Sequence, residues 1–137
     1  MSMQTYIFEL PMEVRDYECD LQGIVNNAVY QNYFEHTRHK FLLSKGIAFS
    51  ELHQRGVDAV VVKVEISFKR SLQPSDQFIS KLSLKKEGVR YVFYQALYSI
   101  NGQTLHASAR IETVILINGK LGFTPELDRL VDEASAL

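Results

Sequence analysis

Residues 14–46 read VRDYECDLQGIVNNAVYQNYFEHTRHKFLLSKG, and this stretch decides the fold. It starts as a strand, turns sharply over residues 20–23, and from about Asn27 has the only long helical pattern in the chain. Residues that suit a protein core recur there at three- and four-residue steps, which predicts a helix with one buried face. They are Tyr30, Tyr33, Phe34, Thr37, Phe41 and Leu42. The pattern therefore predicts that the Asp20 carboxylate lies at or near the start of a buried helix.

Both ends of this helix have typical capping residues. An Asn side chain can accept a hydrogen bond from the free amides of the first turn, so Asn26 or Asn27 is the expected N-cap. Gly46 is expected to end the helix, with Lys45 in the last turn, where a cation suits the helix dipole. Asp20 then has two interpretations. It makes local hydrogen bonds in a turn, or it acts as base or nucleophile on a carbon whose oxygen the helix amides hold.

The remaining chain is mostly β-structure. Alternating patterns predict strands over residues 5–15, 57–72, 78–86, 91–100 and 105–117, with helices over 47–55 and from Thr124 onward. In the second strand, one predicted face holds Val60, Val62, Val64, Ile66 and Phe68. Asn101-Gly102 is the strongest signal for a type I′ hairpin. The predicted fold class is α+β, a curved antiparallel sheet wrapped around one long central helix, in a single domain over residues 1–137.

Composition excludes several classes of protein. A formal net charge of −1 argues against a nucleic-acid binder, which would have a basic excess. No apolar run approaches the ~20 residues of a membrane span, and the start of the chain has no signal-peptide pattern. The single cysteine, Cys19, excludes an intramolecular disulfide and fits a reducing compartment. We expect a cytoplasmic protein that binds neither nucleic acid nor membrane, in which Cys19 is a structural thiol.

The segment YECDLQGIVNNAVYQNYFE resembles the hotdog-fold acyl thioesterases, in particular the group of the 4-hydroxybenzoyl-CoA and short-chain acyl-CoA thioesterases. The shared pattern is an Asp, a Gly three residues later, two aliphatic residues and an aromatic ten residues after the Asp. It is matched by Asp20, Gly23, Ile24, Val25 and Tyr30, followed by Phe34-Glu35. The string ISFKRSLQPSD resembles the strand and turn that follow the helix in this family. The string VNNAVY is similar to the plant acyl-ACP thioesterases.

This resemblance implies hydrolysis of an acyl-CoA or acyl-ACP thioester, without a cofactor. Asp20 would attack the thioester carbon or activate water, and these two roles stay open. The Asn27 amide would bind the thioester carbonyl while its side chain orients water, the alternative for Asn27 being a cap alone. Gly23, Val25 and Tyr30 would contact the substrate. The resemblance also implies a homodimer or homotetramer with the active site between subunits, which the unpaired strand edges of a single chain favour independently.

Other candidate residues have two interpretations each. Lys69, Arg70 and Arg90 would bind the phosphates of CoA, or they are solvated surface charges. Glu35 either reaches the active site from the helix or is solvated. His36 and His39 have a spacing compatible with a metal, but a surface role is favoured, and no metal is expected.

Two further classes of function are weighed against the thioesterase. A non-catalytic acyl-carrier or ligand-binding module on the same fold is the alternative hypothesis. A metal-dependent hydrolase built on His36 and His39 would lose activity with a chelator, and we expect no such loss. The chain has neither a G-x-S-x-G nucleophile elbow nor the His and Pro-Gly loop of the hotdog dehydratases.

Overall fold

The computed structural model describes residues 5–136. Its helices are α1 (Asn27–Ser44), α2 (Phe49–Gln54) and α3 (Pro125–Ser135), with a short 3₁₀ turn at Asp16–Glu18. Its strands are β1 (Phe8–Glu13), β2 (Val57–Phe68), β3 (Gln77–Glu87), β4 (Arg90–Ser99), β5 (Leu105–Ile117) and β6 (Lys120–Gly122). Every predicted helix and strand is present, and β6 is an addition to them.

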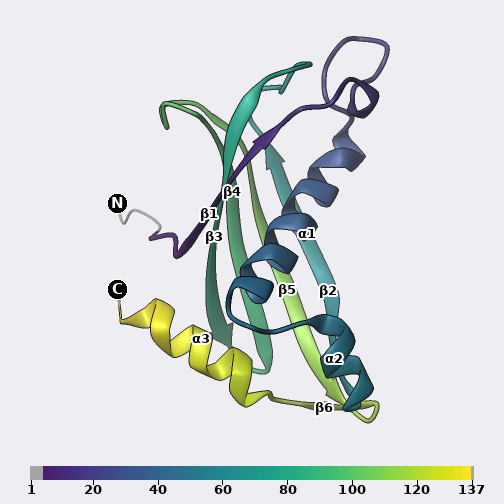
Figure 1. Ribbon diagram of the computed structural model, residues 1–137, viewed down its shortest axis with the longest axis vertical. Helices are drawn as coiled ribbons and strands as arrows, with labels where there is room; N and C mark the ends of the chain where they lie inside the picture. Colours follow the sequence, from purple (N-terminus) through teal and green to yellow (C-terminus); the bar gives the residue numbers. More distant parts are fainter. Residues whose placement is uncertain (1–4, 137) are drawn as a thin grey trace.

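The strands form one curved antiparallel sheet in the order β1-β3-β4-β5-β2, with β6 paired to β5. The long helix α1 crosses the concave face of this sheet, and α3 packs near the end of β3 that leads into β4 (Figure 1). All six predicted core residues of α1 are buried: Tyr30, Tyr33, Phe34, Thr37, Phe41 and Leu42. They meet inward-facing residues such as Phe78 and Leu82 of β3 in one core. The α+β prediction of a sheet around one central helix is therefore confirmed.

The prediction for the apolar face of β2 is wrong in its first half. Val61 pairs with Thr113 and Lys63 with Glu112, so a β-bulge at Val62 shifts the register. Because the side-chain period of a strand is two, one extra residue exchanges the faces. The residues that share the concave face are Val57, Ala59 and Val61 before the bulge and Val64, Ile66 and Phe68 after it.

The hairpin prediction is also corrected. Gly102 has a φ of 76°, but Asn101 is not among the residues with positive φ, so this turn is not type I′. Both Asn118 and Gly119 have positive φ, 51° and 82°, between β5 and β6. The backbone that type I′ requires therefore lies one hairpin later in the chain.

Strand β2 forms one edge of the sheet and is largely exposed. Among the described strands it pairs with β5 alone, which leaves a row of its backbone groups without a strand partner. Its exposed apolar residues include Val62 at 47% and Phe68 at 49% of their full accessible surface. A contiguous apolar edge of this kind is typical of a protein-protein interface. Within residues 5–136, no helix is both long and apolar enough to cross a bilayer.

Candidate active site

Asp20 lies in a tight turn just before α1. Its backbone N–H donates to the Ile24 carbonyl over 2.9 Å, and the Gln22 N–H donates to Asp20 Oδ1 over 2.8 Å. Gly23 has a φ of 77°, a left-handed conformation that strains other residues. The carboxylate is exposed in the single chain, and its Oδ2 atom accepts no hydrogen bond from the described residues. Asp20 therefore makes the predicted local turn contact and keeps one carboxylate oxygen available.

The turn is anchored to the first turns of α1 through Leu72, a buried residue in the loop between β2 and β3. The Val25 N–H donates to the Leu72 carbonyl over 2.9 Å, and the Leu72 N–H donates to the Tyr30 hydroxyl over 3.2 Å. Val25 and Tyr30, which were predicted to contact the substrate, are both buried in the single chain and hold the backbone here. The Tyr30 ring also packs edge-on against Phe68 at 5.1 Å between ring centres. The end of β2 is thus held next to the start of α1.

A second anchor was not foreseen from the sequence. The Glu18 carboxylate accepts hydrogen bonds from the Tyr33 hydroxyl and from the Arg15 N–H, each over 2.8 Å. The Asn26 N–H donates to the Glu18 carbonyl over 3.0 Å. Glu18 was missed because a Glu in a loop is usually solvated. The only signals for Glu18 in the sequence were its position two residues before Asp20 and the predicted burial of Tyr33.

The start of α1 distinguishes the two adjacent asparagines. Asn26 is the N-cap, because its side chain accepts from the Ala28 N–H over 3.0 Å. The Asn27 N–H is among the first amides of the helix, which have no partner within it. In the described part of the chain this N–H donates to no other group, and Asn27 is exposed. The N-cap interpretation therefore applies to Asn26, and Asn27 offers a free donor at the positive end of the helix.

The cysteine beside Asp20 does not have the environment of a nucleophile. Burial raises the pKa of the Cys19 thiol, and the neighbouring carboxylates, Asp16 first, raise it further. A reactive cysteine needs the opposite, a lowered pKa. Cys19 forms a β-bridge with Val25 across the Asp20 turn.

The predicted phosphate-binding residues lie at two ends of the sheet. The backbone N–H groups of Lys69 and Arg70 donate to the His106 carbonyl, and their exposed side chains have no ion-pair partner in residues 5–136. Both lie near Leu72 and hence near the Asp20 turn. Arg90 follows the β3–β4 hairpin and is separated from Lys69 and Arg70 by the length of β3. The eleven residues of β3 span roughly 35 Å at the usual strand rise. One chain therefore does not bring Arg90 to Asp20.

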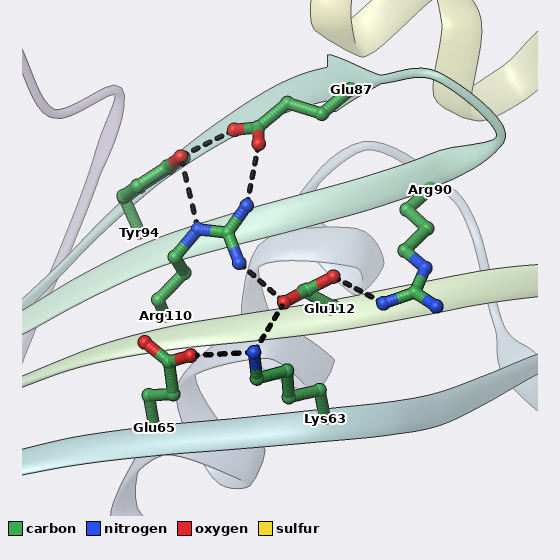
Figure 2. Close-up of polar contacts among 7 residues, drawn as sticks. All are labelled: Lys63, Glu65, Glu87, Arg90, Tyr94, Arg110 and Glu112. Atoms are coloured by element: carbon green, nitrogen blue, oxygen red, sulfur yellow. Dashed lines mark hydrogen bonds and ion pairs between the residues drawn. The ribbon is translucent and has the colours of Figure 1, made fainter.

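Arg90 is also engaged in a charge network on the convex face of the sheet. Figure 2 shows the Glu112 carboxylate between the side chains of Arg90, Arg110 and Lys63. The hydrogen bond from Arg90, and then that from Arg110, holds the pKa of Glu112 below its ordinary value. Tyr94 and Glu87 complete the network with Arg110. A phosphate at Arg90 would have to compete with Glu112.

A pocket of about 520 Å³ opens between α1, α2 and the concave face of the sheet. Glu35, Arg38 and His39 line it from α1, with apolar residues such as Phe49 and Phe93 opposite. Asp20 and Asn27 are not among its lining residues. Glu35 lines this pocket with an exposed side chain that contacts His39, and in one chain the pocket and the Asp20 turn are separate, so Glu35 does not reach Asp20.

Arg38 is the unusual residue of this pocket and was missed by sequence reasoning. Its Nη1 donates to Gln95 Oε1 over 3.1 Å, and Gln95 Nε2 donates to the Phe34 carbonyl over 2.9 Å. Burial lowers the pKa of Arg38, and the charge of nearby Glu35 opposes this shift. No carboxylate in the described chain forms an ion pair with Arg38, although Glu35 lies 3.8 Å from His39. The helical pattern places Arg38 on a polar face and could not reveal that its cation is half-buried.

The histidines do not form a metal site with other ligands. Residues 5–136 contain no group of three or more His, Cys, Asp or Glu side chains placed to hold a metal ion. His39 instead packs edge-on against Phe49, with 5.0 Å between ring centres.

Comparison with known proteins identifies the family. The model of the thioesterase-like superfamily matches residues 14–133. An acyl-acyl carrier protein thioesterase of Arabidopsis thaliana is 36% identical over 63% of this chain and 45% of its own length. A second one is 35% identical over 80% of this chain and 59% of its own length. The chain thus spans about half the length of these curated relatives. A putative esterase of Aquifex aeolicus is 32% identical over 82% of this chain and 88% of its own length.

Solved structures agree on the fold. A hypothetical protein of Aquifex aeolicus has a TM-score of 0.82 at 28% identity, covering 91% of this chain and 98% of its own. A 1,4-dihydroxy-2-naphthoyl-CoA thioesterase of Synechocystis has a TM-score of 0.85 at 14% identity, covering 93% and 97%. At that identity the likeness shows the fold alone, and the predicted hotdog fold is confirmed. The chain therefore belongs to the thioesterase-like superfamily.

Proposed function

We propose that the chain is an acyl thioesterase that hydrolyses an acyl-CoA or acyl-ACP thioester to a free acid and a thiol. The observation that carries this proposal is the pair formed by Asp20 and Asn27. A carboxylate with a free oxygen stands in the turn before a helix whose first N–H is also free. Hydrolysis of a thioester needs both a base or nucleophile and a donor for the oxyanion.

The chemistry follows from the two groups. The thioester oxygen accepts from the Asn27 N–H, which polarises the carbonyl and stabilises the negative charge of the tetrahedral intermediate. In one route, Asp20 attacks the carbonyl carbon, the C–S bond breaks, and water then hydrolyses the mixed anhydride. In the other route, Asp20 removes a proton from the attacking water. The thiolate takes up a proton in either route, so no redox step or metal is needed.

We further propose that two copies pair through β2. Antiparallel pairing of the free β2 edges would bury the exposed Val62 and extend the sheet across the dimer. A two-fold axis at the middle of β2 places the Phe68 end of one copy beside the Val57 end of the other. Phe68 contacts Tyr30 near the Asp20 turn, whereas Val57 lines the pocket. Each Asp20 would then face the pocket of the other subunit, in a dimer or in a tetramer of two dimers.

The proposed substrate carrier is CoA or ACP. Two relatives are named acyl-acyl carrier protein thioesterases, and the Synechocystis structure is named a CoA thioesterase. Lys69 and Arg70 are the proposed ligands of a carrier phosphate near Asp20, because both side chains are free. Arg90 would serve only if phosphate displaces Glu112. A cytoplasmic location remains our proposal.

The test compares Asp20→Asn with wild type on matched panels of acyl-CoA and acyl-ACP thioesters. Asn can still accept from the Gln22 N–H, so the turn is expected to stay folded. We expect hydrolysis to fall by roughly 100-fold or more. Asp16→Asn, an exposed change four residues earlier, is the matched control. If wild type binds these thioesters and turns over none of them, the non-catalytic binding module replaces the thioesterase.

A further inference from the structure

The 520 Å³ pocket between α1, α2 and the sheet contains two polar groups whose hydrogen-bonding capacity is not used. Arg38 carries five N–H donors, of which Nη1 alone contacts an acceptor in the described residues, Gln95 Oε1. Thr113 also lines the pocket and is 4% exposed, and its Oγ1 atom has no hydrogen-bond partner within residues 5–136. Buried polar groups without partners are rare in native proteins and call for an explanation.

Apolar side chains form one part of the pocket wall around these two groups. The Arg38 guanidinium lies 6.0 Å from the centre of the Phe93 ring, and Phe49 and Leu42 form part of the same wall. A half-buried cation without a carboxylate partner is unfavourable on its own, because it has lost water without gaining an ion pair. A ligand that enters the pocket and supplies an acceptor would remove this penalty. The pocket is also within the size range of small-molecule sites.

The charges in the pocket indicate which acceptor fits. Glu35 and Asp58 line the pocket together with Arg38, and each carboxylate contacts a histidine of the same lining, Glu35 with His39 at 3.8 Å and Asp58 with His53 at 2.6 Å. A ligand carboxylate would therefore approach two like charges, whereas a neutral hydroxyl or carbonyl oxygen would not. The Arg38 N–H groups can donate to such an oxygen, and the Thr113 hydroxyl can donate to it or accept from it.

We propose that this pocket binds the acyl group of the substrate, and that Arg38 and Thr113 select acyl groups with a neutral oxygen in addition to the thioester carbonyl. The substrate class is thus a hydroxyacyl or oxoacyl thioester. The inference rests on the proposed thioesterase function, with the acyl group in the pocket of the subunit that faces Asp20. Arg38 and Thr113 are specificity-determining residues, and the reaction itself does not require them.

The experiment uses octanoyl-CoA, a set of hydroxyoctanoyl-CoA isomers with the hydroxyl at different carbons, and octanedioyl-CoA, whose chain ends in a carboxylate. For wild type we expect kcat/KM for at least one hydroxy isomer to exceed that for octanoyl-CoA by about tenfold or more, since an unsubstituted chain leaves both polar groups unpaired. Octanedioyl-CoA should be a poorer substrate than octanoyl-CoA. Arg38→Met should abolish the preference, because kcat/KM should fall about tenfold more for the preferred hydroxy isomer than for octanoyl-CoA.

Two further variants separate selection from folding. Thr113→Val should reduce the preference and also raise the urea midpoint, because it removes a buried hydroxyl that has no partner. Arg129→Met removes the same charge from an exposed position on α3 and should change neither quantity. An equal fall in kcat/KM for all substrates in Arg38→Met would instead mean that Arg38 positions the reacting groups, and would overturn the inference.

The inference and the proposed function can fail separately. Hydrolysis without a preference for any hydroxy isomer overturns the inference and leaves the thioesterase intact. If wild type hydrolyses nothing, the pocket is tested by calorimetry with octyl-CoA and the hydroxyoctyl-CoA thioethers, which cannot be hydrolysed. A tenfold difference in Kd that disappears in Arg38→Met supports the pocket even without catalysis. Equal binding, or none, overturns it.

Discussion

The Tyr33 hydroxyl donates a hydrogen bond to Glu18 Oε1 over 2.8 Å, and both side chains are buried. This contact joins the loop that carries Asp20 to the second turn of α1. Burial raises the pKa of Tyr33, and the hydrogen bond to Glu18 raises it further, so the hydroxyl remains a donor at every physiological pH. The spacing between Asp20 and the start of the helix therefore depends on a buried side-chain pair as well as on the turn.

Tyr33→Phe should lower the free energy of unfolding by about 1–3 kcal/mol, because it leaves a buried carboxylate with one donor fewer. Urea denaturation at neutral pH measures this difference. The control is Tyr17→Phe, which removes a hydroxyl that is on an 81% exposed side chain and should have no measurable effect. Equal midpoints for wild type and Tyr33→Phe would mean that water replaces the Tyr33 hydroxyl at Glu18.

The fold could be predicted largely because its strongest signals are local. The six buried residues of α1 follow a single helical period, and Gly46 and Thr124 mark helix ends by their own chemistry. The bulge at Val62 could not be predicted, because an unbroken run of valines gives no sign of where one residue is left unpaired. The prediction of a type I′ turn at Asn101 was wrong for a related reason, because tertiary context overrides a dipeptide preference.

The candidate site was predictable only where it is contiguous in sequence. Asp20 and Asn27 lie within one motif, so a short stretch suffices to place them together. Glu18, Arg38 and Thr113 gain their roles from residues distant in sequence, namely Tyr33 for the first and Gln95 for the second. Burial of a charged or polar side chain is a property of the packed chain, and composition and period carry no information about it.

Val62→Asp should convert the proposed dimer to a monomer and reduce thioester hydrolysis. Val62 lies in the bulge, has no register partner on β5 and is 47% exposed, so a charge there affects an interface more than the core. Sedimentation velocity compares the mass of wild type and variant. Leu121→Asp, at a 55% exposed position on β6, is the matched control and should keep the wild-type mass. A monomeric wild type that is fully active would contradict the pairing through β2.

Glu126→Gln should change how stability depends on acid pH. Hydrogen bonds from Thr124, from its own backbone and from Arg55 lower the pKa of Glu126 from its ordinary 4.5 to about 2. The folded state therefore binds this proton less readily than the unfolded state. The carboxylate contributes stability above pH 4.5, and this contribution is lost as the pH falls through the interval from 4.5 to about 2.

The measurement for Glu126 is a series of urea unfolding curves between neutral pH and pH 2. Wild type should be more stable than Glu126→Gln at neutral pH, and the difference should shrink as the solution is acidified. Glu51→Gln, at an exposed position on α2 with no ion-pair partner in the described chain, is the control and should leave the urea midpoint at neutral pH close to that of wild type. A constant gap for Glu126→Gln would show that the three hydrogen bonds do not affect proton binding.

Mixing two inactive variants tests whether Asp20 acts on a substrate held by the other subunit. Asp20→Asn removes the proposed base or nucleophile, and Ala59→Trp fills the pocket that Ala59 lines. Each variant alone should be inactive. In a mixed dimer, the intact Asp20 of one copy faces the intact pocket of the other, which restores one of two sites. Random pairing makes half of the dimers mixed, so unfolding and refolding an equal mixture should recover about a quarter of wild-type activity. Recovery near zero, with mixed dimers present by native mass spectrometry, would place Asp20 and its pocket in the same chain.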